Sequence, residues 1–366
     1  MMDFTLDQTQ REIAEVTAGV LDRAGRRNPA EGWQAIVDGG LLGLALPEQY
    51  GGDGLGLCEV GVVLTEVGRR GLSLPLMTTL ALGALPLARS GTRQQQQTYL
   101  PPVAKEGRVL SAALHEPSQP LPTRPRMLAR RDGDRFLVNG VALAVPYADR
   151  ADRILVPVTI PDAGVGLLIV DPRSRGAVLS DSPSAGDEPQ HRLELTDVAV
   201  PVADLVGERC DGEAVRDLYR VAVVAAALTA DGLLAGALAL TAAHVAQRQQ
   251  FGRPLATLQA VAQQIADVYV SSRALHLAAW SACWRLAEGR EPGPDPAVAA
   301  YWVAEHLRPA LATCHHLHGG LGLDNSYPLH RFSAAAADLA RFVGGSERGL
   351  ERLGDELFGE QGAEPC

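Results

Sequence analysis

The sequence predicts an α+β protein in three parts: an N-terminal helical domain over residues 1–110, a small β-barrel or sandwich over 111–208, and a C-terminal four-helix bundle over 209–366. Three observations predict this order. Apolar residues recur with the helical period before residue 110, short β-branched runs alternate with turn residues up to about residue 207, and long helical patterns return from about residue 211. A length of 366 residues is enough for several domains with a substantial core.

The N-terminal part reads as helices separated by glycine- and proline-containing breaks. A helix starts at Thr5, and its apolar residues keep the helical period through Ile13 and Val20. The run from Pro47 to Gly52 is one of the breaks, because proline and glycine interrupt a helical pattern. Four further helices are predicted at Trp33–Gly39, Leu57–Gly68, Pro75–Ala88 and Gln94–Ala104.

The middle part consists of short runs of β-branched residues bounded by turn residues. Asp132-Gly133 and Asn139-Gly140 are dipeptides typical of tight hairpin turns, so the chain is predicted to turn at both. The Pro- and Ser-rich run 117–125 and the polar run 180–190 are predicted as loops on the rim of the β-domain. Strands are predicted at Phe136–Gly140, Arg153–Val158, Gly166–Val170 and Arg192–Leu195.

Long helices return in the C-terminal part. Its most apolar stretch, Val221–Ala243, is long enough to cross a membrane. Asp231 interrupts the middle of this alanine-rich stretch, so we expect a buried helix of a large helical protein and no membrane span. Helices are predicted at Asp211–Gln249, Leu258–Ala287 and Pro294–His318, with a last pair after Pro328.

Composition narrows the classes of partner and compartment. With 43 acidic against 33 basic residues, the chain lacks the basic excess that binds a nucleic-acid backbone, whereas a nucleotide-like cofactor needs only one or two arginines. No basic segment followed by an apolar run opens the sequence, so we expect a cytoplasmic protein without a secretory signal. Five scattered cysteines without a CxxC pair are typical of reduced thiols: Cys58, Cys210, Cys283, Cys314 and Cys366.

Two segments carry candidate chemistry. Arg248 lies near the end of a predicted helix, where an arginine by itself is typical of helix capping. Three histidines gather in the second segment, but His315 and His316 point apart on a helix, so no metal site is predicted. The turn Gly319-Gly320 follows that helix, and residues without a Cβ let backbone N–H groups approach an anion.

Three motifs in this order, on a helical–β–helical plan, resemble those of the acyl-CoA dehydrogenase family, and the resemblance covers nearly the whole chain. It implies a tetrameric flavoprotein in which an acyl-CoA thioester loses its α-proton to a glutamate and its β-hydride to FAD. The motifs are Arg248-x-x-Phe251-Gly252-Arg253-Pro254 with Gln259, His318-Gly319-Gly320-Leu321-Gly322 with Tyr327-Pro328, and Phe342–Glu347.

The resemblance also implies which residues hold the cofactor. Arg248, Phe251 and Gln259 of one subunit are expected to contact the FAD of a neighbouring subunit, together with Gly319 and Gly320. His316 stands where the family usually has glutamine. An arginine and a glycine-rich backbone suit the pyrophosphate of FAD.

The sequence departs from the family at the positions that would hold the flavin ring of the same chain. The loop that usually reads Thr-Glu-Pro reads His115-Glu116-Pro117, and the Gly-Ser-Asp that usually follows is absent. Ala144 and Pro146 stand where the family has tryptophan and threonine. Alanine cannot stack on the ring, and proline offers it neither an N–H nor a hydroxyl.

The glutamate base is also missing from both positions that the family uses. These positions are Val343 and Ala222, and Val223 stands where an arginine usually follows Ala222. Neither valine nor alanine accepts a proton, so no catalytic base is predicted at these sites. Glu347, one helical turn past Val343, is a weak candidate for which a solvated surface position is favoured.

The residues that the resemblance assigns to the FAD site of a neighbouring subunit are therefore present, whereas those that it assigns to the chain's own FAD site are absent. The favoured reading is a subunit of a heteromeric acyl-CoA dehydrogenase, whose homologous partner holds the flavin ring and the glutamate. By resemblance, such assemblies act on bulky thioesters such as steroid side chains and pass electrons to an electron-transfer acceptor. Two alternatives stay open: a self-sufficient homotetramer whose base is Glu347 or Asp217, and a flavin-free structural subunit.

Overall fold

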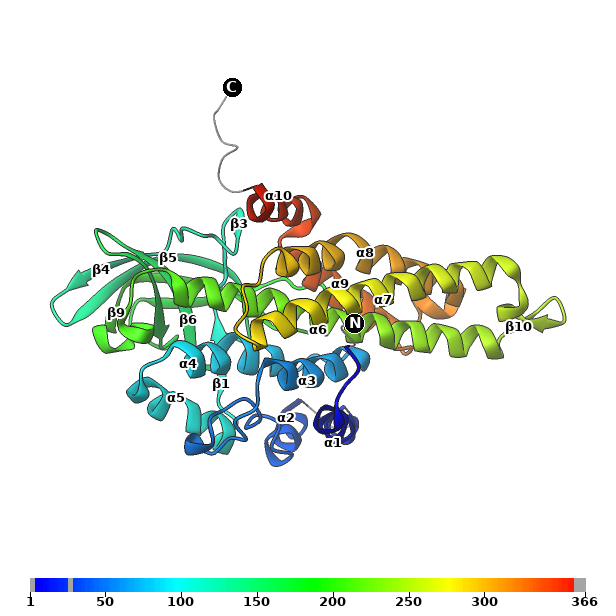
Figure 1. The fold of residues 1–366 in the computed structure, drawn as a ribbon, viewed down its shortest axis with the longest axis horizontal. Coiled ribbons are helices and arrows are strands. Elements are labelled where there is room, and N and C mark those ends of the chain that lie inside the picture. Colours follow the sequence, from blue (N-terminus) through cyan, green and yellow to red (C-terminus); the bar gives the residue numbers. More distant parts are fainter. Residues whose placement is uncertain (1–3, 26–28, 359–366) are drawn as a thin grey trace, which may run out of the picture.

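The computed structural model of the chain describes residues 4–25 and 29–358 (Figure 1). The predicted fold class is confirmed: helices come first, a sheet follows, and helices return. The first three residues of the sequence and Cys366 lie outside the described residues.

The N-terminal helices pack around α3, and each begins or ends at a local signal. α1 begins at Gln8 and not at Thr5, because the Asp7 carboxylate caps it by accepting from the Gln10 N–H at 2.8 Å. The predicted helix Pro75–Ala88 is a π-helical stretch, η2, followed by α4. The bounds are α1 Gln8–Ala24, α2 Pro29–Asp38, η1 Glu48–Tyr50, α3 Leu57–Arg69, η2 Met77–Ala84, α4 Leu85–Ser90 and α5 Arg93–Glu106.

A nine-stranded sheet follows, with both parallel and antiparallel pairs. The long strands β5 and β9 pair antiparallel, and β1 and β4 each pair parallel with β6. The bounds are β1 Val109–Ala112, β2 His115–Glu116, β3 Gln119–Pro120, β4 Leu128–Asp132, β5 Arg135–Pro146, β6 Ala151–Ile160, β7 Gly164–Val170, β8 Ala177–Ser182 and β9 Gln190–Pro201.

Only one of the two predicted hairpin turns forms. The chain turns after Asp132, which pairs with Arg135 across a two-residue loop. Asn139 and Gly140 instead lie inside β5, at a bulge where the register with β9 shifts. Asn139 and Asp197 hold this bulge: the Asn139 Nδ2–H donates to the Asp197 carboxylate, and the Asp197 N–H donates to the Asn139 amide oxygen, both at 2.9 Å. The prediction of a turn at Asn139-Gly140 is therefore wrong, because a cross-strand partner uses the polar side chain.

The sheet has two cores. Leu155 and Leu167 face the helices and belong to the large core that also contains α3 and α6. Phe136, Val156 and Val198 line a smaller core inside the sheet itself. One face of the sheet is therefore fixed against the helical parts, which sets the position of the loops at its rim.

The C-terminal helices pack as a bundle around α6, which has 35 residues. α3 crosses α6 closely: a Cβ at Gly232 would lie 1.9 Å from the Thr65 carbonyl oxygen, so only glycine fits there. The bounds are η3 Val202–Asp204, η4 Val206–Glu208, α6 Glu213–Gln247, β10 Gln249–Gln250, β11 Arg253–Pro254, η5 Leu255–Thr257, α7 Gln259–Ala287, α8 Asp295–His318, η6 Gly319–Leu323, α9 Leu329–Phe342 and α10 Gly345–Phe358.

Among the described residues, α6 is the one helix long and apolar enough to cross a membrane. Its most apolar window is 83% buried inside the molecule, as expected for a core helix. Asp231, predicted to interrupt it, is 4% exposed and accepts from the Nδ1 of His276 at 2.9 Å and the indole N–H of Trp280 at 3.2 Å. The carboxylate is therefore buried with two donors instead of facing lipid.

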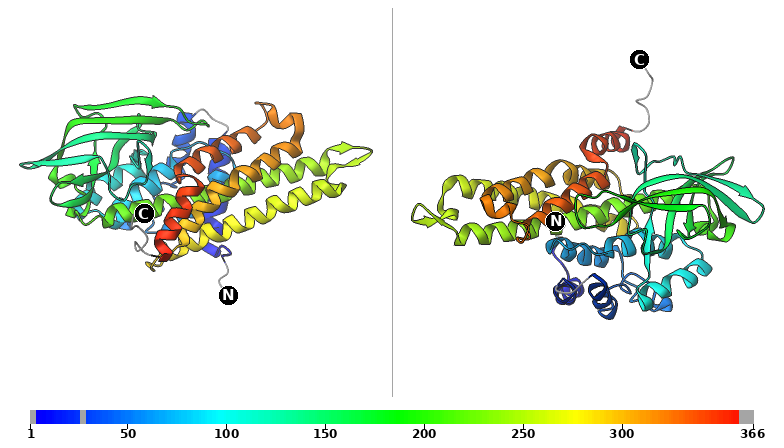
Figure 2. Two further views of the ribbon diagram at one scale, coloured as in Figure 1. Left: turned by 90° about the horizontal axis from the view of Figure 1, so that it is seen from above. Right: turned by 180° about the vertical axis from the view of Figure 1, so that it is seen from behind.

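The two ends of the molecule differ in character. The sheet occupies one end, and the tip of the α6–α7 hairpin, carrying β10 and β11, projects at the other (Figures 1 and 2). This separation decides which predicted site residues can act together.

Candidate functional site

The first motif forms an exposed ribbon at the tip of the α6–α7 hairpin. α6 ends at Gln247, and β10 pairs antiparallel with β11. Phe251 and Gly252 between them have φ values of 55° and 75°, the left-handed pair that a tight two-residue turn requires. Phe251 is 87% exposed, and Arg248 is exposed as well. The ribbon therefore presents an aromatic ring and a guanidinium away from the body of the chain.

The second motif lies beside the end of α6. The rings of His244 and His318 stack with centroids 4.5 Å apart, joining α6 to the end of α8. The Nδ1 of His318 donates to the Cys314 carbonyl oxygen at 2.8 Å, so its Nε2 accepts from the Tyr327 hydroxyl at 3.0 Å. Burial lowers the pKa of both histidines, which keeps the stacked rings neutral.

This chain of contacts holds the glycine turn open. Gly319 has a φ of 57°, and no heavy atom lies within 4 Å of a Cβ built on Gly319 or on Gly320. The backbone here is free to approach a flat or anionic group, which is the property predicted from the sequence. Gln259, the first residue of α7, and His316 are exposed too.

The histidines of this segment have separate roles. The Nε2 of His315 lies 2.6 Å from the Ser333 hydroxyl, whereas its neighbour His316 faces solvent. Within residues 4–25 and 29–358, no three His, Cys, Asp or Glu side chains are grouped as metal ligands.

Away from the hairpin tip, the two segments that the resemblance assigns to the chain's own flavin touch each other directly. The Nε2–H of His115 on β2 donates to the Phe342 carbonyl oxygen at 2.8 Å, and the two rings meet edge to face with centroids 5.1 Å apart. Arg352 of α10 adds a second link by donating to the Pro120 carbonyl oxygen at 2.9 Å. The loop around β2 and β3 is therefore joined directly to the ends of α9 and α10.

The residues that replace the usual flavin contacts have structural partners. Ala144 lies at a bulge of β5 with a φ of 50°, and the buried Pro146 accepts from the Ser111 hydroxyl at 2.6 Å. The Glu116 carboxylate is 6% exposed and accepts from the backbone N–H groups of Arg126 and Met127, both at 2.8 Å. Glu116 therefore fixes the loop before β4 and is not free for a ligand.

No carboxylate occupies either position expected for the base. Val343 and Ala222 are both 0% exposed. Asp217 forms a two-point ion pair with Arg89, at 2.8 and 2.9 Å. Glu347 lies exposed on the first turn of α10.

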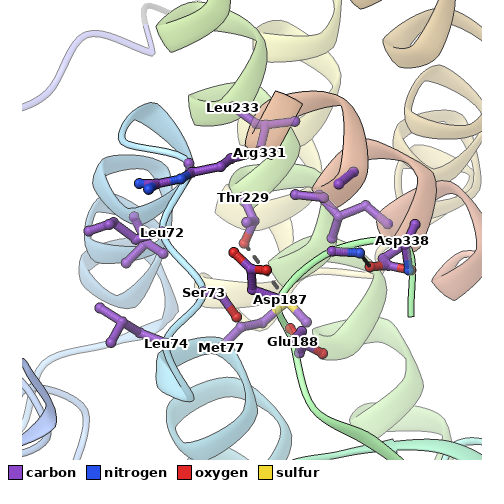
Figure 3. Close-up of a pocket in the computed structure, with 18 of the residues that line it drawn as sticks. Leu72, Ser73, Leu74, Met77, Asp187, Glu188, Thr229, Leu233, Arg331 and Asp338 are labelled. Atoms are coloured by element: carbon purple, nitrogen blue, oxygen red, sulfur yellow. Dashed lines mark hydrogen bonds between the residues drawn. The ribbon is translucent and has the colours of Figure 1, made fainter. Parts of the chain in front are cut away.

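A pocket lies between α3, α6, α9 and the loop that joins β8 to β9 (Figure 3). The Asp338 carboxylate holds this loop by accepting from the N–H groups of Ala185 at 2.9 Å and Gly186 at 3.0 Å. Asp187 and Glu188 of the loop line the pocket beside Ser73, Met77 and Thr229.

Sequence reasoning considered Asp338 as a carboxylate near the expected base but missed Asp187 and Glu188 of this pocket. Burial, and then the charge of Asp338, raise the pKa of Glu188 to about 7. The polar run 180–190 was the only signal in the sequence, and it predicts a loop without indicating which helix the loop meets. Three acidic residues, Asp187, Glu188 and Asp338, line this pocket together with Arg331 and His330.

The fold and the first two motifs define a class, the helical–β–helical flavoprotein dehydrogenases. The sequence matches the N-terminal domain of acyl-CoA dehydrogenases over residues 5–107 and the C-terminal domain over residues 217–357. It is 41% identical, over 96% of this chain and 98% of the relative, to acyl-CoA dehydrogenase FadE28 of Mycobacterium tuberculosis. The chain belongs to the acyl-CoA dehydrogenase family, a family of oxidoreductases whose cofactor is FAD.

Two solved heteromeric assemblies have the same fold. The ChsE4-ChsE5 complex from Mycobacterium tuberculosis matches with a TM-score of 0.90 at 29% identity, covering 97% of this chain and 99% of that chain. A variant of the Tcur3481-Tcur3483 steroid acyl-CoA dehydrogenase matches with a TM-score of 0.88 at 33% identity, covering 96% of this chain and 98% of that one. The resemblance to heteromeric members of the family is therefore confirmed.

Proposed function

We propose that this chain is one subunit of a heteromeric, FAD-dependent acyl-CoA dehydrogenase that introduces an α,β double bond into an acyl-CoA thioester. A homologous catalytic subunit holds the flavin ring and supplies the glutamate base, and the two form a cytoplasmic heterotetramer. When bound, FAD would supply the acceptor for the hydride of the β-carbon, and an electron-transfer acceptor would take the electrons onward.

One observation carries the proposal: the cofactor-type residues lie far from the segments that the resemblance assigns to the chain's own flavin. The α6–α7 tip, which carries Arg248 and Phe251, projects at one end of the molecule, whereas the β2–β3 hairpin lies beside α10 (Figures 1 and 2). Arg248 and Phe251 can therefore meet a flavin only on another subunit. Where the resemblance implies the chain's own flavin, His115 contacts Phe342, and the buried Val343 stands where a base would be.

Each donated residue has a physical task in this proposal. Arg248 pairs its guanidinium with the pyrophosphate, and Phe251 buries its exposed ring against the cofactor or the partner. Gly319 and Gly320 bring backbone N–H groups close, while Gln259 and His316 supply hydrogen bonds from either side. The neutral histidine stack leaves the positive charge at this end of the site to the arginines of the ribbon, Arg248 and Arg253.

The substrate class rests on the relatives. One solved neighbour is described as a steroid acyl-CoA dehydrogenase and is 33% identical to this chain. We propose a bulky thioester, such as one carrying a steroid side chain, as the substrate of the assembly.

The self-sufficient homotetramer is the less supported alternative. Its two candidate bases both have ordinary structural positions, since Asp217 is paired with Arg89 and Glu347 is exposed on α10. Neither is placed to take a proton from a ligand in the pocket of Figure 3, because neither is among the residues that line it.

The test is purification of the chain alone and together with a homologous glutamate-bearing subunit. We expect the chain alone to lack visible flavin absorbance and the mixed complex to be yellow and to reduce an acceptor with acyl-CoA. A yellow, active chain on its own would refute the heteromer, and a colourless, inactive mixed complex would favour a flavin-free structural subunit.

Arg248→Ala tests the donated half of the site. Loss of a hydrogen bond to a charged group removes about 1.5–3 kcal/mol, so FAD binding by the mixed complex is expected to weaken about 10- to 150-fold. Arg130→Ala, which removes the same charge from exposed strand β4 at the opposite end, is the matched control. Equal FAD affinity in both variants would show that Arg248 has no such role.

A further inference from the structure

Two cysteines from distant parts of the sequence meet at the junction of the N- and C-terminal helices. The thiol of Cys283 on α7 donates to the sulfur of Cys58 on α3, with the two Sγ atoms 3.8 Å apart. The residues are 225 positions apart in the chain. The sequence alone predicts both as unconnected reduced thiols, and the proposed dehydrogenase function uses neither.

The two sulfurs differ in exposure and in environment. Cys58 is the second residue of α3, where the partial positive charge of a helix N-terminus favours a thiolate. It is half-buried, whereas Cys283 is buried. A small oxidant in solvent can therefore reach the sulfur of Cys58 more easily than the buried sulfur of Cys283.

The hydrogen bond fixes the direction of reactivity. The S–H donated by Cys283 lowers the pKa of Cys58, against burial and the nearby carboxylates of Glu59, Glu288 and Asp7, which raise it. The same bond, and then burial, raise the pKa of Cys283. Cys58 is thus the nucleophile of the pair and Cys283 the thiol that follows.

The α3 surface also leaves room for the second sulfur. A Cβ placed on Gly61, one turn after Cys58, would lie 3.6 Å from the Cys283 sulfur. The Cys283 side chain therefore packs over a glycine at this helix crossing, with its sulfur 3.8 Å from that of Cys58.

We propose that Cys58 and Cys283 are a peroxide-reactive dithiol that closes to a disulfide between α3 and α7. The Cys58 thiolate attacks one oxygen of hydrogen peroxide, the O–O bond breaks, hydroxide leaves, and Cys58 becomes a sulfenic acid. The Cys283 sulfur then attacks the Cys58 sulfur, the S–O bond breaks, and the departing hydroxide takes the Cys283 proton as water. Two thiols lose two electrons in total, and one peroxide becomes two waters.

The closing reaction protects Cys58 from irreversible oxidation. A sulfenic acid with a second thiol 3.8 Å away is converted to a disulfide before more peroxide arrives, whereas an isolated sulfenic acid proceeds to sulfinic acid. A thiol reductant restores both cysteines.

The experiment treats the full-length protein, in its mixed complex, with one equivalent of hydrogen peroxide, blocks the remaining thiols by alkylation, and maps peptides by mass spectrometry. We expect the Cys58–Cys283 linkage to be the main product and to disappear on reduction. Recovery of both cysteines as alkylated thiols, or oxidation of Cys210 ahead of Cys58, would overturn the proposal.

Variants separate the two roles. Cys283→Ser and Cys283→Ala are expected to abolish the linkage and to leave Cys58 as a sulfenic acid trapped by dimedone or as sulfinic acid. Cys210→Ser is the matched control and should form the linkage as the parent does, because Cys210 lies on the sheet side of the molecule. If both Cys283 variants are misfolded by circular dichroism, the alkylation rates of the unaltered protein decide the matter.

The alkylation rates of the cysteines test the assignment of Cys58 as the nucleophile independently of the disulfide. Burial and Asp211 raise the pKa of Cys210, whereas that of Cys58 is lowered. The thiol with the lower pKa has the larger thiolate fraction at neutral pH, so Cys58 should react faster with iodoacetamide than Cys210. Equal rates would refute the assignment of Cys58 as the nucleophile.

Discussion

Phe251 gives the sharpest test of how this chain uses its hairpin tip. The side chain is 87% exposed in the isolated chain, so Phe251→Ala removes almost no buried area and should leave the unfolding temperature of the chain unchanged. In the mixed complex the same ring is proposed to be buried. The substitution therefore separates folding from assembly.

The magnitude follows from the exposed fraction. Burying a whole phenylalanine side chain is worth about 1.5–3 kcal/mol, and the 87% still exposed leaves about 1.3–2.6 kcal/mol for the interface. At about 1.4 kcal/mol per factor of ten, the variant should weaken retention of FAD and partner by about 10- to 80-fold.

The assay is a pair of measurements on each variant: thermal unfolding of the chain alone, and flavin retention of the mixed complex during dilution. Phe136→Ala is the matched control, because Phe136 is 3% exposed in the core of the sheet and its loss should destabilise the fold by about 3–5 kcal/mol. The reasoning is refuted if Phe251→Ala lowers the unfolding temperature as Phe136→Ala does, or if flavin retention is unchanged.

The remaining predictions concern the pocket loop and the helix crossing. Asp338→Ala removes two charge-assisted hydrogen bonds to the β8–β9 loop, worth about 1.5–3 kcal/mol each at most, so limited proteolysis should cut that loop faster. The pKa of Glu188 is raised to about 7, so its ionisation lowers the stability of the folded chain as the pH rises through that value. Glu188→Gln removes this ionisation and should stabilise the chain by about 1–2 kcal/mol near pH 8, after allowance for solvent screening. Thermal unfolding measures the difference. Gly232→Ala places a Cβ 1.9 Å from the Thr65 carbonyl oxygen and should destabilise by about 3 kcal/mol or more in urea unfolding.

Each of these three predictions has a control or an outcome that would contradict it. Below about pH 4.5 the wild type and Glu188→Gln should have the same stability, and a constant difference at every pH would contradict the titration of Glu188. Gly354→Ala on α10, where nothing lies within 4 Å of the new Cβ, should stabilise slightly, by about 0.5–1 kcal/mol. A neutral Gly232→Ala would show that α3 and α6 separate easily, and unchanged cleavage in Asp338→Ala would show that other contacts hold the loop.

Features that depend on neighbours in sequence were predictable. The helical period placed the long helices within a few residues, and Asp132-Gly133 turned as expected because a turn depends on local backbone preferences. Local signals failed where a distant residue competes for the same side chain. Asn139 bonds to Asp197 across the sheet, so the same type of dipeptide became a bulge.

The sequence alone showed the motif around Arg248 and the valine at position 343. It therefore also showed that the residues for a neighbour's FAD site are present while those for the chain's own FAD site are absent. Three facts needed the tertiary structure, because each joins residues that no local pattern connects. They are the contact of His115 with Phe342, 227 residues apart, the stack of His244 on His318, and the pair Cys58 and Cys283. Chain composition and periodicity decide which face of an element is buried, while the packing of whole elements decides which buried faces meet.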